Sequence, residues 1–252
     1  MIEALDLKKT FRDRKRGEVR AVDGISFIAR PGTILGLLGA NGAGKTTTLR
    51  MLATLLTPSA GTARVAGFDI REKPREVREH IGFLTGSTAL YGRLTAREMI
   101  DYFGRLHGLD GAALRERADE LIAELQIAEF ADRRCDKLST GQKQRVSIAR
   151  SIVHRPPVMI FDEPTTGLDV MTSRTIMRFI ERCRLDGRTV VFSTHIMSEA
   201  ERLCDTIAVV HAGRIVATGT LEELRQRTGR TALESVFLAL IGEPEDEDAP
   251  AS

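Results

Sequence analysis

The sequence contains no tryptophan, only three cysteines among its 252 residues, and almost no excess of either charge. Cys135, Cys183 and Cys204 fall in no paired motif, so we expect a reducing compartment rather than a disulfide framework. A formal net charge of +2 is too small to indicate nucleic-acid binding by itself. The first residues, MIEALDLKKTF, carry too many charged side chains to be read as a signal peptide.

Long hydrophobic runs are also missing. The longest, such as TILGLLGA at 33–40, fall far short of the roughly 20 residues that span a bilayer. With 42% hydrophobic and 29% charged residues, the chain can still bury a core and remain soluble. We therefore expect any role at a membrane to depend on a separate partner chain.

The apolar residues form short segments typical of an α/β fold. We predict strands at 2–7, 19–29, 33–39, 81–84, 158–163 and 189–195, and a hairpin over 207–219 that turns at Ala212 and Gly213. We predict helices at 45–56, 112–125 and 172–184, and one that Ser139 opens and the RPP at 155–157 stops. A further helix is opened by Thr95 with Glu98, and a last one by Thr231 with Glu234. The stretch from about 85 to 156 is interpreted as an inserted α-helical subdomain, and 242–252 as an acidic, disordered tail.

The stretch GANGAGKT satisfies the phosphate-loop pattern G-x-x-x-x-G-K-[ST], between a predicted strand and a predicted helix. In such a loop, backbone N–H groups wrap phosphates, Lys45 reaches the β and γ oxygens, and Thr46 offers its hydroxyl to Mg²⁺. The residues predicted to bind nucleotide here are Gly39, Asn41, Gly42, Ala43, Gly44, Lys45, Thr46 and Thr47.

Two further strands end in polar residues. VMIFDE places Asp162 and Glu163 at the carboxyl end of a buried strand, the edge where open α/β sheets bind ligands. Asp162 can hold Mg²⁺ and Glu163 can polarise the attacking water as a general base, although two such acids can also cap a helix. His195 closes the strand at 189–195 at the same edge, where it can contact a γ-phosphate or serve a purely structural role.

A second helix start suited to an anion lies in LSTGQKQRVSIAR at 138–150. Ser139 occupies the N-cap position, and Gly141 leaves the backbone bare for a ligand. The chain thus has two phosphate-facing helix starts, about 100 residues apart in sequence.

Taken together and in this order, these motifs resemble those of the ABC-type ATPases, the nucleotide-binding subunits of ATP-binding-cassette transporters. The similarity runs over about residues 2–241, with LSTGQ as the signature and PTTGLD following the acidic strand. The resemblance implies one ABC ATPase domain at 1–241, with an α/β P-loop NTPase (RecA-like) core, an antiparallel β subdomain and the inserted α-helical subdomain. It also implies that Phe11 stacks on adenine and that the chain is an ATPase using ATP and Mg²⁺.

The resemblance gives a reason for the second helix start. Two chains of this family pack head to tail, so that Ser139, Gly141 and Gln142 bind the γ-phosphate held by the partner chain and Asp169 lies at the subunit contact. It implies a homodimer at the cytoplasmic face of the cell membrane, driving a separate integral membrane permease subunit. The stretch STALYGRLTARE is similar to the sodium- or drug-exporting branch, and Leu90 and Tyr91 are candidates for exposed permease contacts or for ordinary core packing.

The sequence departs from the family at two positions. Thr140 stands where glycine is more common, and threonine suits a helix start, so we expect little change. Gly86 stands where the family has a glutamine that reaches toward Mg²⁺ and the attacking water. A hydroxyl of Thr85, Ser87 or Thr88, or a water molecule, is expected to replace it.

Two other functions compete with the transporter subunit. A soluble ABC ATPase acting on nucleic acid or ribosomes has support only from RDRKRGEVR at 12–20, which also suits a solvated hairpin tip. We therefore expect no nucleic-acid partner. A GTPase is disfavoured because no N-K-x-D motif is present.

Overall fold

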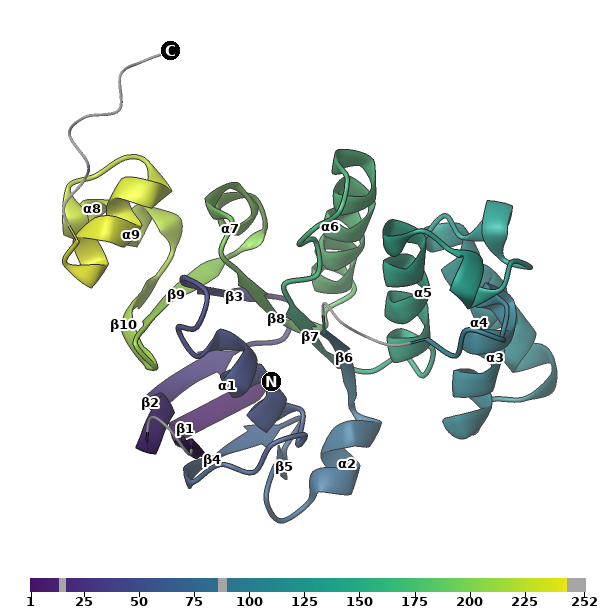
Figure 1. The fold of residues 1–252 in the computed structure, drawn as a ribbon, viewed down its shortest axis with the longest axis horizontal. Coiled ribbons are helices and arrows are strands. Elements are labelled where there is room, and N and C mark those ends of the chain that lie inside the picture. The colour runs from purple at the N-terminus through teal and green to yellow at the C-terminus, as the bar shows by residue number, and fades with distance from the viewer. Residues whose placement is uncertain (14–16, 86–89, 244–252) are drawn as a thin grey trace.

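Two β-sheets organise the described part of the chain (Figure 1). The structure, a computed structural model, describes residues 1–13, 17–85 and 90–243. The antiparallel sheet has the order β2-β1-β4-β5, made of β1 (Ile2–Asp13), β2 (Gly17–Ala29), β4 (Ala60–Val65) and β5 (Phe68–Asp69). The larger sheet has the order β10-β9-β3-β8-β7-β6, made of β3 (Ile34–Leu38), β6 (Ile81–Thr85), β7 (Val158–Asp162), β8 (Thr189–Thr194), β9 (Thr206–His211) and β10 (Arg214–Gly219).

The larger sheet is parallel except at its β10 edge. Every residue of β3, β7 and β8 is buried, which explains why these strands read as continuous apolar runs in the sequence. Because β3, β8 and β7 are parallel neighbours, their carboxyl ends meet at one edge of the sheet. This edge receives the loops that carry the predicted phosphate, metal and catalytic groups.

Helices cover the sheets and extend the molecule to both sides (Figure 1). In chain order they are α1 (Lys45–Leu52), α2 (Pro74–Glu79), α3 (Ala96–Leu106), α4 (Gly111–Glu124), α5 (Thr140–Ile152), α6 (Val170–Leu185), α7 (Met197–Leu203), α8 (Leu221–Thr228) and α9 (Leu233–Ile241). α3, α4 and α5 gather at one end, while α8 and α9 pack beside β10 at the other. In the described part of the chain, no helix combines the length and apolar composition needed to cross a bilayer.

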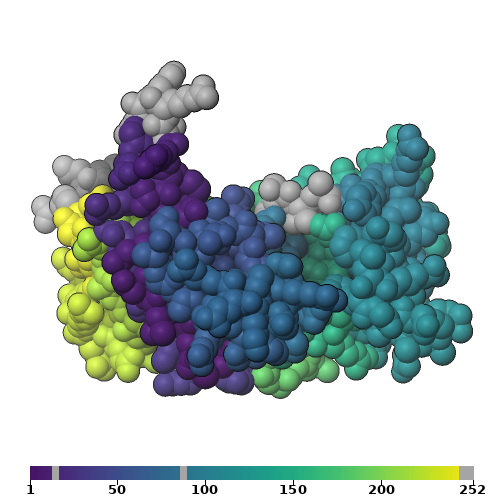
Figure 2. Space-filling view, turned by 90° about the horizontal axis from the view of Figure 1, so that it is seen from below, coloured from purple at the N-terminus to yellow at the C-terminus, as the bar shows by residue number. Residues whose placement is uncertain are grey.

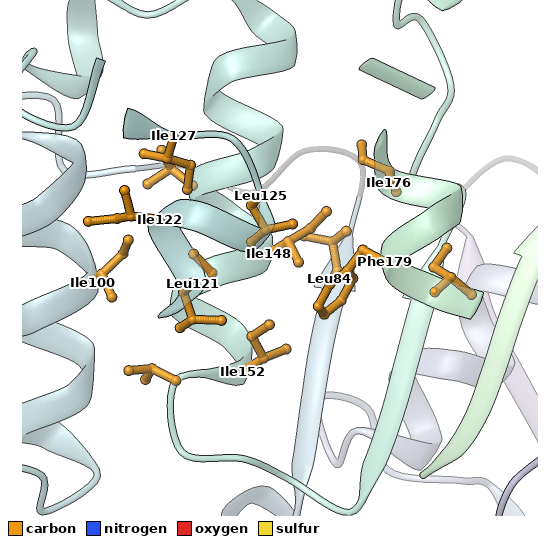
Figure 3. Close-up of a cluster of buried hydrophobic side chains, with 14 of the residues drawn as sticks. Leu84, Ile100, Leu121, Ile122, Leu125, Ile127, Ile148, Ile152, Ile176 and Phe179 are labelled. Carbon is orange, nitrogen blue, oxygen red and sulfur yellow. The ribbon is translucent and has the colours of Figure 1, made fainter. Parts of the chain in front are cut away.

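One hydrophobic cluster joins the helices at 96–152 to the larger sheet (Figure 3). Leu84 of β6, Ile148 of α5 and Phe179 of α6 meet in it, and all three are buried. Burying side chains of this size stabilises the fold by roughly 1.5–3 kcal/mol each. The helices therefore share a core with the sheet. The precise division of the chain into an ATPase domain and a helical subdomain remains a prediction.

The structure confirms the α/β class with a mainly parallel core sheet and an antiparallel second sheet. It also confirms the capping box of Thr95 and Glu98, in which each residue's side chain binds the other's backbone N–H. The hairpin turn at Ala212 and Gly213 is present, and both residues have positive φ angles.

Several boundaries were predicted wrongly. The first strand, predicted at 2–7, extends to Asp13, and two helices differ at one end. The first helix ends at Leu52 instead of residue 56, because Thr54 adopts a left-handed conformation with φ of 58°. The last helix has its N-cap at Ala232, with no side-chain cap, so Thr231 and Glu234 do not form the predicted cap. The carbonyl of Thr231 instead accepts a hydrogen bond from Arg225. Gly86, most of the predicted acidic tail and residues 14–16 of the basic hairpin lie outside the described residues.

Candidate functional site

The phosphate loop connects β3 to α1 and lines a pocket of about 220 Å³. Gly42 and Gly44 have φ angles of 82° and 107°, which residues other than glycine rarely adopt. A Cβ atom on Gly44 would also come within 2.5 Å of the Ala21 carbonyl oxygen on β2. The pocket is lined by Ala21, Asn41, Gly42, Ala43, Gly44, Lys45, Thr46, Thr47 and Glu163. The predicted loop residues are thus gathered around one space at a helix N-terminus, a geometry suited to phosphate.

Lys45 points its ammonium group back across the loop. It is only 4% exposed, and Nζ donates hydrogen bonds to the carbonyls of Gly39 and Ala40 at 2.6 and 3.1 Å. Nζ also lies 3.2 Å from Oε1 of Glu163. Gly39 therefore belongs to the site through its carbonyl. A buried cation with three oxygen partners can exchange one of them for a phosphate oxygen at little desolvation cost.

Asp162 places a carboxylate at the end of β7. Its Oδ1 accepts hydrogen bonds from the hydroxyls of Thr46 at 2.9 Å and Ser193 at 2.8 Å. Sequence reasoning missed Ser193, which lies opposite Asp162 in the β7–β8 register. A carboxylate and a hydroxyl are ligands that Mg²⁺ accepts, usually together with phosphate oxygens and water. The residues therefore fit Mg²⁺ brought in with a nucleotide, and in the described chain no three His, Cys, Asp or Glu side chains cluster as a metal site of their own.

Glu163 is held between two basic side chains. Its backbone has a φ of 48°, and its N–H donates to both the carbonyl and the hydroxyl of Ser193. Such strained conformations occur preferentially at active sites. His195 Nδ1 lies 3.3 Å from Oε2, although the two atoms are not aligned for a hydrogen bond.

The charges around Glu163 keep it ionised. Burial by itself raises the pKa of this carboxyl, but the attraction of Lys45 and His195 outweighs burial and holds the pKa below its ordinary value. An ionised carboxylate next to the phosphate pocket can accept a proton from water. The structure thus brings together Lys45, Thr46, Asp162, Glu163 and His195.

The signature residues lie on a different surface of the chain. Ser139 caps α5, its hydroxyl accepting from the Gln142 N–H at 3.3 Å, while the Gln142 side chain accepts from the Ser139 N–H at 3.0 Å. A Cβ on Gly141 would come within 2.8 Å of the Thr172 hydroxyl, which Asp169 binds. This close approach of α5 and α6 is a packing reason for Gly141 that the sequence did not reveal. Among the described residues, the lining of the phosphate-loop pocket includes none from the signature.

Phe11 lies on the β1–β2 hairpin, opposite Val19. The residue is 41% exposed, and the Lys9 ammonium lies 5.4 Å from the centroid of its ring. Ala21 on the neighbouring strand lines the phosphate-loop pocket, but Phe11 itself does not. Its contact with adenine therefore remains a prediction.

Several known proteins are similar to this chain in sequence and in fold. The sequence model of the ABC transporter family matches residues 22–166. The ABC transporter ATP-binding protein NatA of Bacillus subtilis (strain 168) is 41% identical over 242 residues, which cover 96% of this chain and 98% of that protein. The daunorubicin resistance ATP-binding protein DrrA3 of Streptomyces coeruleorubidus is 38% identical over 225 residues, covering 89% and 71%.

Solved structures agree with these relatives. An ATP-binding subunit of an ABC transporter aligns with a TM-score of 0.86 at 28% identity, covering 96% of this chain and 99% of that one. A dimeric ATP-binding cassette in a post-hydrolysis state, bound to ADP and Pi, aligns with a TM-score of 0.79 at 26% identity, covering 87% and 98%. The chain therefore belongs to the family of ABC transporter ATP-binding subunits and is an ATPase.

Proposed function

We propose that two copies of this chain pack head to tail, hydrolyse MgATP between them, and so drive a separate permease at the cytoplasmic face of the membrane. The observation that carries the proposal is the separation of the two helix starts. The phosphate-loop pocket holds Lys45 and Glu163, whereas Ser139 and Gln142 cap a helix on another surface. A second copy can bring its helix start to the open side of the nucleotide. A related cassette is dimeric with ADP and Pi bound, which supports the pairing of two copies.

The residues in and beside the phosphate-loop pocket divide the chemistry among them. Mg²⁺, when bound by Thr46 and Asp162 together with phosphate oxygens, would neutralise charge that develops on the phosphates. The γ-phosphate competes with Glu163 for Lys45, and this exchange frees the carboxylate to take the proton of the attacking water. His195 lies where it can stabilise the transferred phosphoryl group.

Charge explains how hydrolysis becomes movement. The negative charge of the γ-phosphate attracts two helix N-termini. One begins at Lys45 of the same chain, and the other is the helix start at Ser139 in the second copy. Loss of the γ-phosphate removes the anion that both ends share. The dimer then opens, which couples chemistry to the permease.

A groove beside the helices suits the permease. It has a volume of about 450 Å³ and separates the α1 and β6 side from α3 and α5. Figure 2 shows a hollow between the blue and teal parts of the surface. The groove is lined by Ala53, Leu55, Arg78, Ile81, Phe83, Phe103, His107, Arg150, Ser151 and His154. Half of these residues are Arg, His or Ser, but most of the surface that they expose to the groove is apolar. Such a surface fits a short apolar helix of a membrane protein, for which exposed aromatic side chains nearby are suitable anchors.

The two candidate contact residues differ in their surroundings. Tyr91 is 55% exposed and stacks on Phe103, a lining residue of the groove, with ring centroids 6.4 Å apart. Leu90 is partly buried and packs against the core. We therefore assign the permease contact to Tyr91 and core packing to Leu90.

A binding experiment with a co-encoded membrane protein tests this assignment. Tyr91→Ala should weaken capture of that protein by about tenfold, which corresponds to roughly 1.4 kcal/mol for an aromatic anchor. Leu185→Ala, which truncates an exposed side chain at the end of α6, is the matched control and should bind as the wild type does. Unchanged capture by Tyr91→Ala would remove Tyr91 from the docking surface.

The alternative function on nucleic acid or ribosomes gains no support from the relatives described above, whose names are those of transporter and drug-resistance ATP-binding proteins. Hydrolysis stimulated by DNA or RNA in a salt-sensitive manner would revive that alternative.

A further inference from the structure

A buried carboxylate outside the phosphate-loop pocket connects the two loops that carry Glu163 and His195. Glu199 in α7 is 7% exposed. Its Oε1 accepts a hydrogen bond from the Thr165 hydroxyl at 2.5 Å, and its Oε2 accepts one from the Thr194 hydroxyl at 2.8 Å. Thr165 follows Glu163 by two residues, and Thr194 directly precedes His195. One side chain thus spans both loops.

A carboxylate in this place is costly for stability. Both threonine partners are themselves buried, so the carboxyl group of Glu199 lies away from solvent and faces two neutral hydroxyls. Removing so polar a group from water is compensated only in part by hydrogen bonds of this kind, and apolar side chains of similar volume often fill such sites at no loss. The benefit of Glu199 is therefore to be sought in the groups that it holds in place.

The hydrogen bonds continue on both sides of Glu199. The Thr194 hydroxyl also accepts from the Ile196 N–H at 2.9 Å, which closes the turn around His195. On the other side, the Gln144 side chain of α5 donates to the Pro164 carbonyl at 2.9 Å. The route from α5 to the turn of His195 therefore passes through Pro164, Thr165 and Glu199.

We propose that Glu199 is a positioning residue, which fixes the turn of His195 to the Pro164–Asp169 segment and thereby sets His195 against Glu163. The proposal rests on the role given above to His195 in ATP hydrolysis. His195 and Glu163 lie 3.3 Å apart, although they belong to loops that follow two different strands, β8 and β7 respectively. The Glu199 side chain hydrogen-bonds to a residue of each loop, Thr165 and Thr194. Misplacement of a reacting group by about 1 Å can lower a rate on the order of 10²-fold.

Isosteric substitutions test this proposal with little change in volume. Glu199→Gln keeps one acceptor oxygen and replaces the other with a donor, so one threonine hydroxyl loses its acceptor. We expect kcat for ATP to fall roughly tenfold while KM stays within about twofold, because the phosphate-loop residues are untouched. Thr165→Val should lower kcat in the same way. Glu201→Gln, on the exposed face of the same helix, is the matched control and should keep the wild-type kcat.

The His195→Ala background distinguishes positioning from a general effect on folding. If Glu199 acts through His195, then adding Glu199→Gln to His195→Ala causes no further loss of kcat. If Glu199→Gln lowers kcat by the same factor in the wild-type and the His195→Ala backgrounds, the proposal is overturned. Wild-type kcat in both Glu199→Gln and Thr165→Val would also overturn it. If Glu199→Gln does not fold, Thr165→Val in the two backgrounds decides the question alone. Wild-type turnover of His195→Ala would instead refute the role of His195 on which the proposal rests.

Discussion

Replacement of Glu163 by glutamine removes the proposed base with almost no change in shape. The amide oxygen can still accept from Lys45, which also keeps the Gly39 and Ala40 carbonyls at 2.6 and 3.1 Å. The phosphate loop should therefore remain intact, and ATP should bind at least as tightly because one negative charge facing the γ-phosphate is gone. Loss of a positioned general base lowers a rate by about 10²–10⁴-fold. That range corresponds to roughly 3–5 kcal/mol of activation free energy.

Phosphate release at saturating MgATP measures this loss, and a nucleotide titration of the same variant measures binding. Glu181→Gln is a suitable control, since Glu181 pairs at the surface with Arg202 at 3.4 Å and should tolerate the change. The expected result is turnover reduced at least 10²-fold with ATP affinity retained. Turnover of Glu163→Gln within about threefold of wild type would show that Glu163 is not the base. Loss of ATP binding would show that its pairing with Lys45 maintains the loop.

Two further predictions concern stability. Arg117 is buried and donates to two carbonyls at the end of α5, at 2.9 and 3.1 Å, so Arg117→Ala should lower the free energy of unfolding by about 2–4 kcal/mol. A loss below about 0.5 kcal/mol in urea unfolding would contradict this account of the end of the helix. Burial, with a smaller effect of the stacked His107, lowers the pKa of His154 to about 4. In the unfolded chain the same imidazole takes up a proton near pH 6.5. The free energy of unfolding is therefore highest above that pH and falls below it, by up to about 2 kcal/mol between pH 7 and 5. His154→Gln should flatten that decline, and an unchanged slope would refute the assignment.

The sequence predicted those parts of the site that depend on neighbours along the chain. The phosphate loop, the acidic end of β7 and the capping box of Thr95 and Glu98 all arise from local residue patterns. The buried strands were equally visible, because a parallel sheet covered on both faces needs unbroken apolar runs. Each of these features can be predicted without knowing which strands pair with each other.

Features that depend on strand register and tertiary packing were not predictable from one sequence. The contact of Ser193 with Asp162 follows from the register of β7 against β8. The constraint on Gly141 comes from Thr172, 31 residues away along the chain. The short helices α2, α7 and α8 contain too few turns for apolar periodicity to mark them, so Glu199 gave no local signal at all.

We propose that two chains together complete each ATP site, and a mixture of two defective variants tests whether the site is shared. Lys45→Ala disables the phosphate loop, and Gly141→Ala places a methyl group against Thr172 at the start of the signature helix. Each variant alone should hydrolyse ATP very slowly. Mixed in equal amounts before ATP is added, they should recover up to about a quarter of the wild-type phosphate release, because half of the dimers contain one intact site. A mixture no faster than the sum of the two separate variants would contradict a site shared between chains.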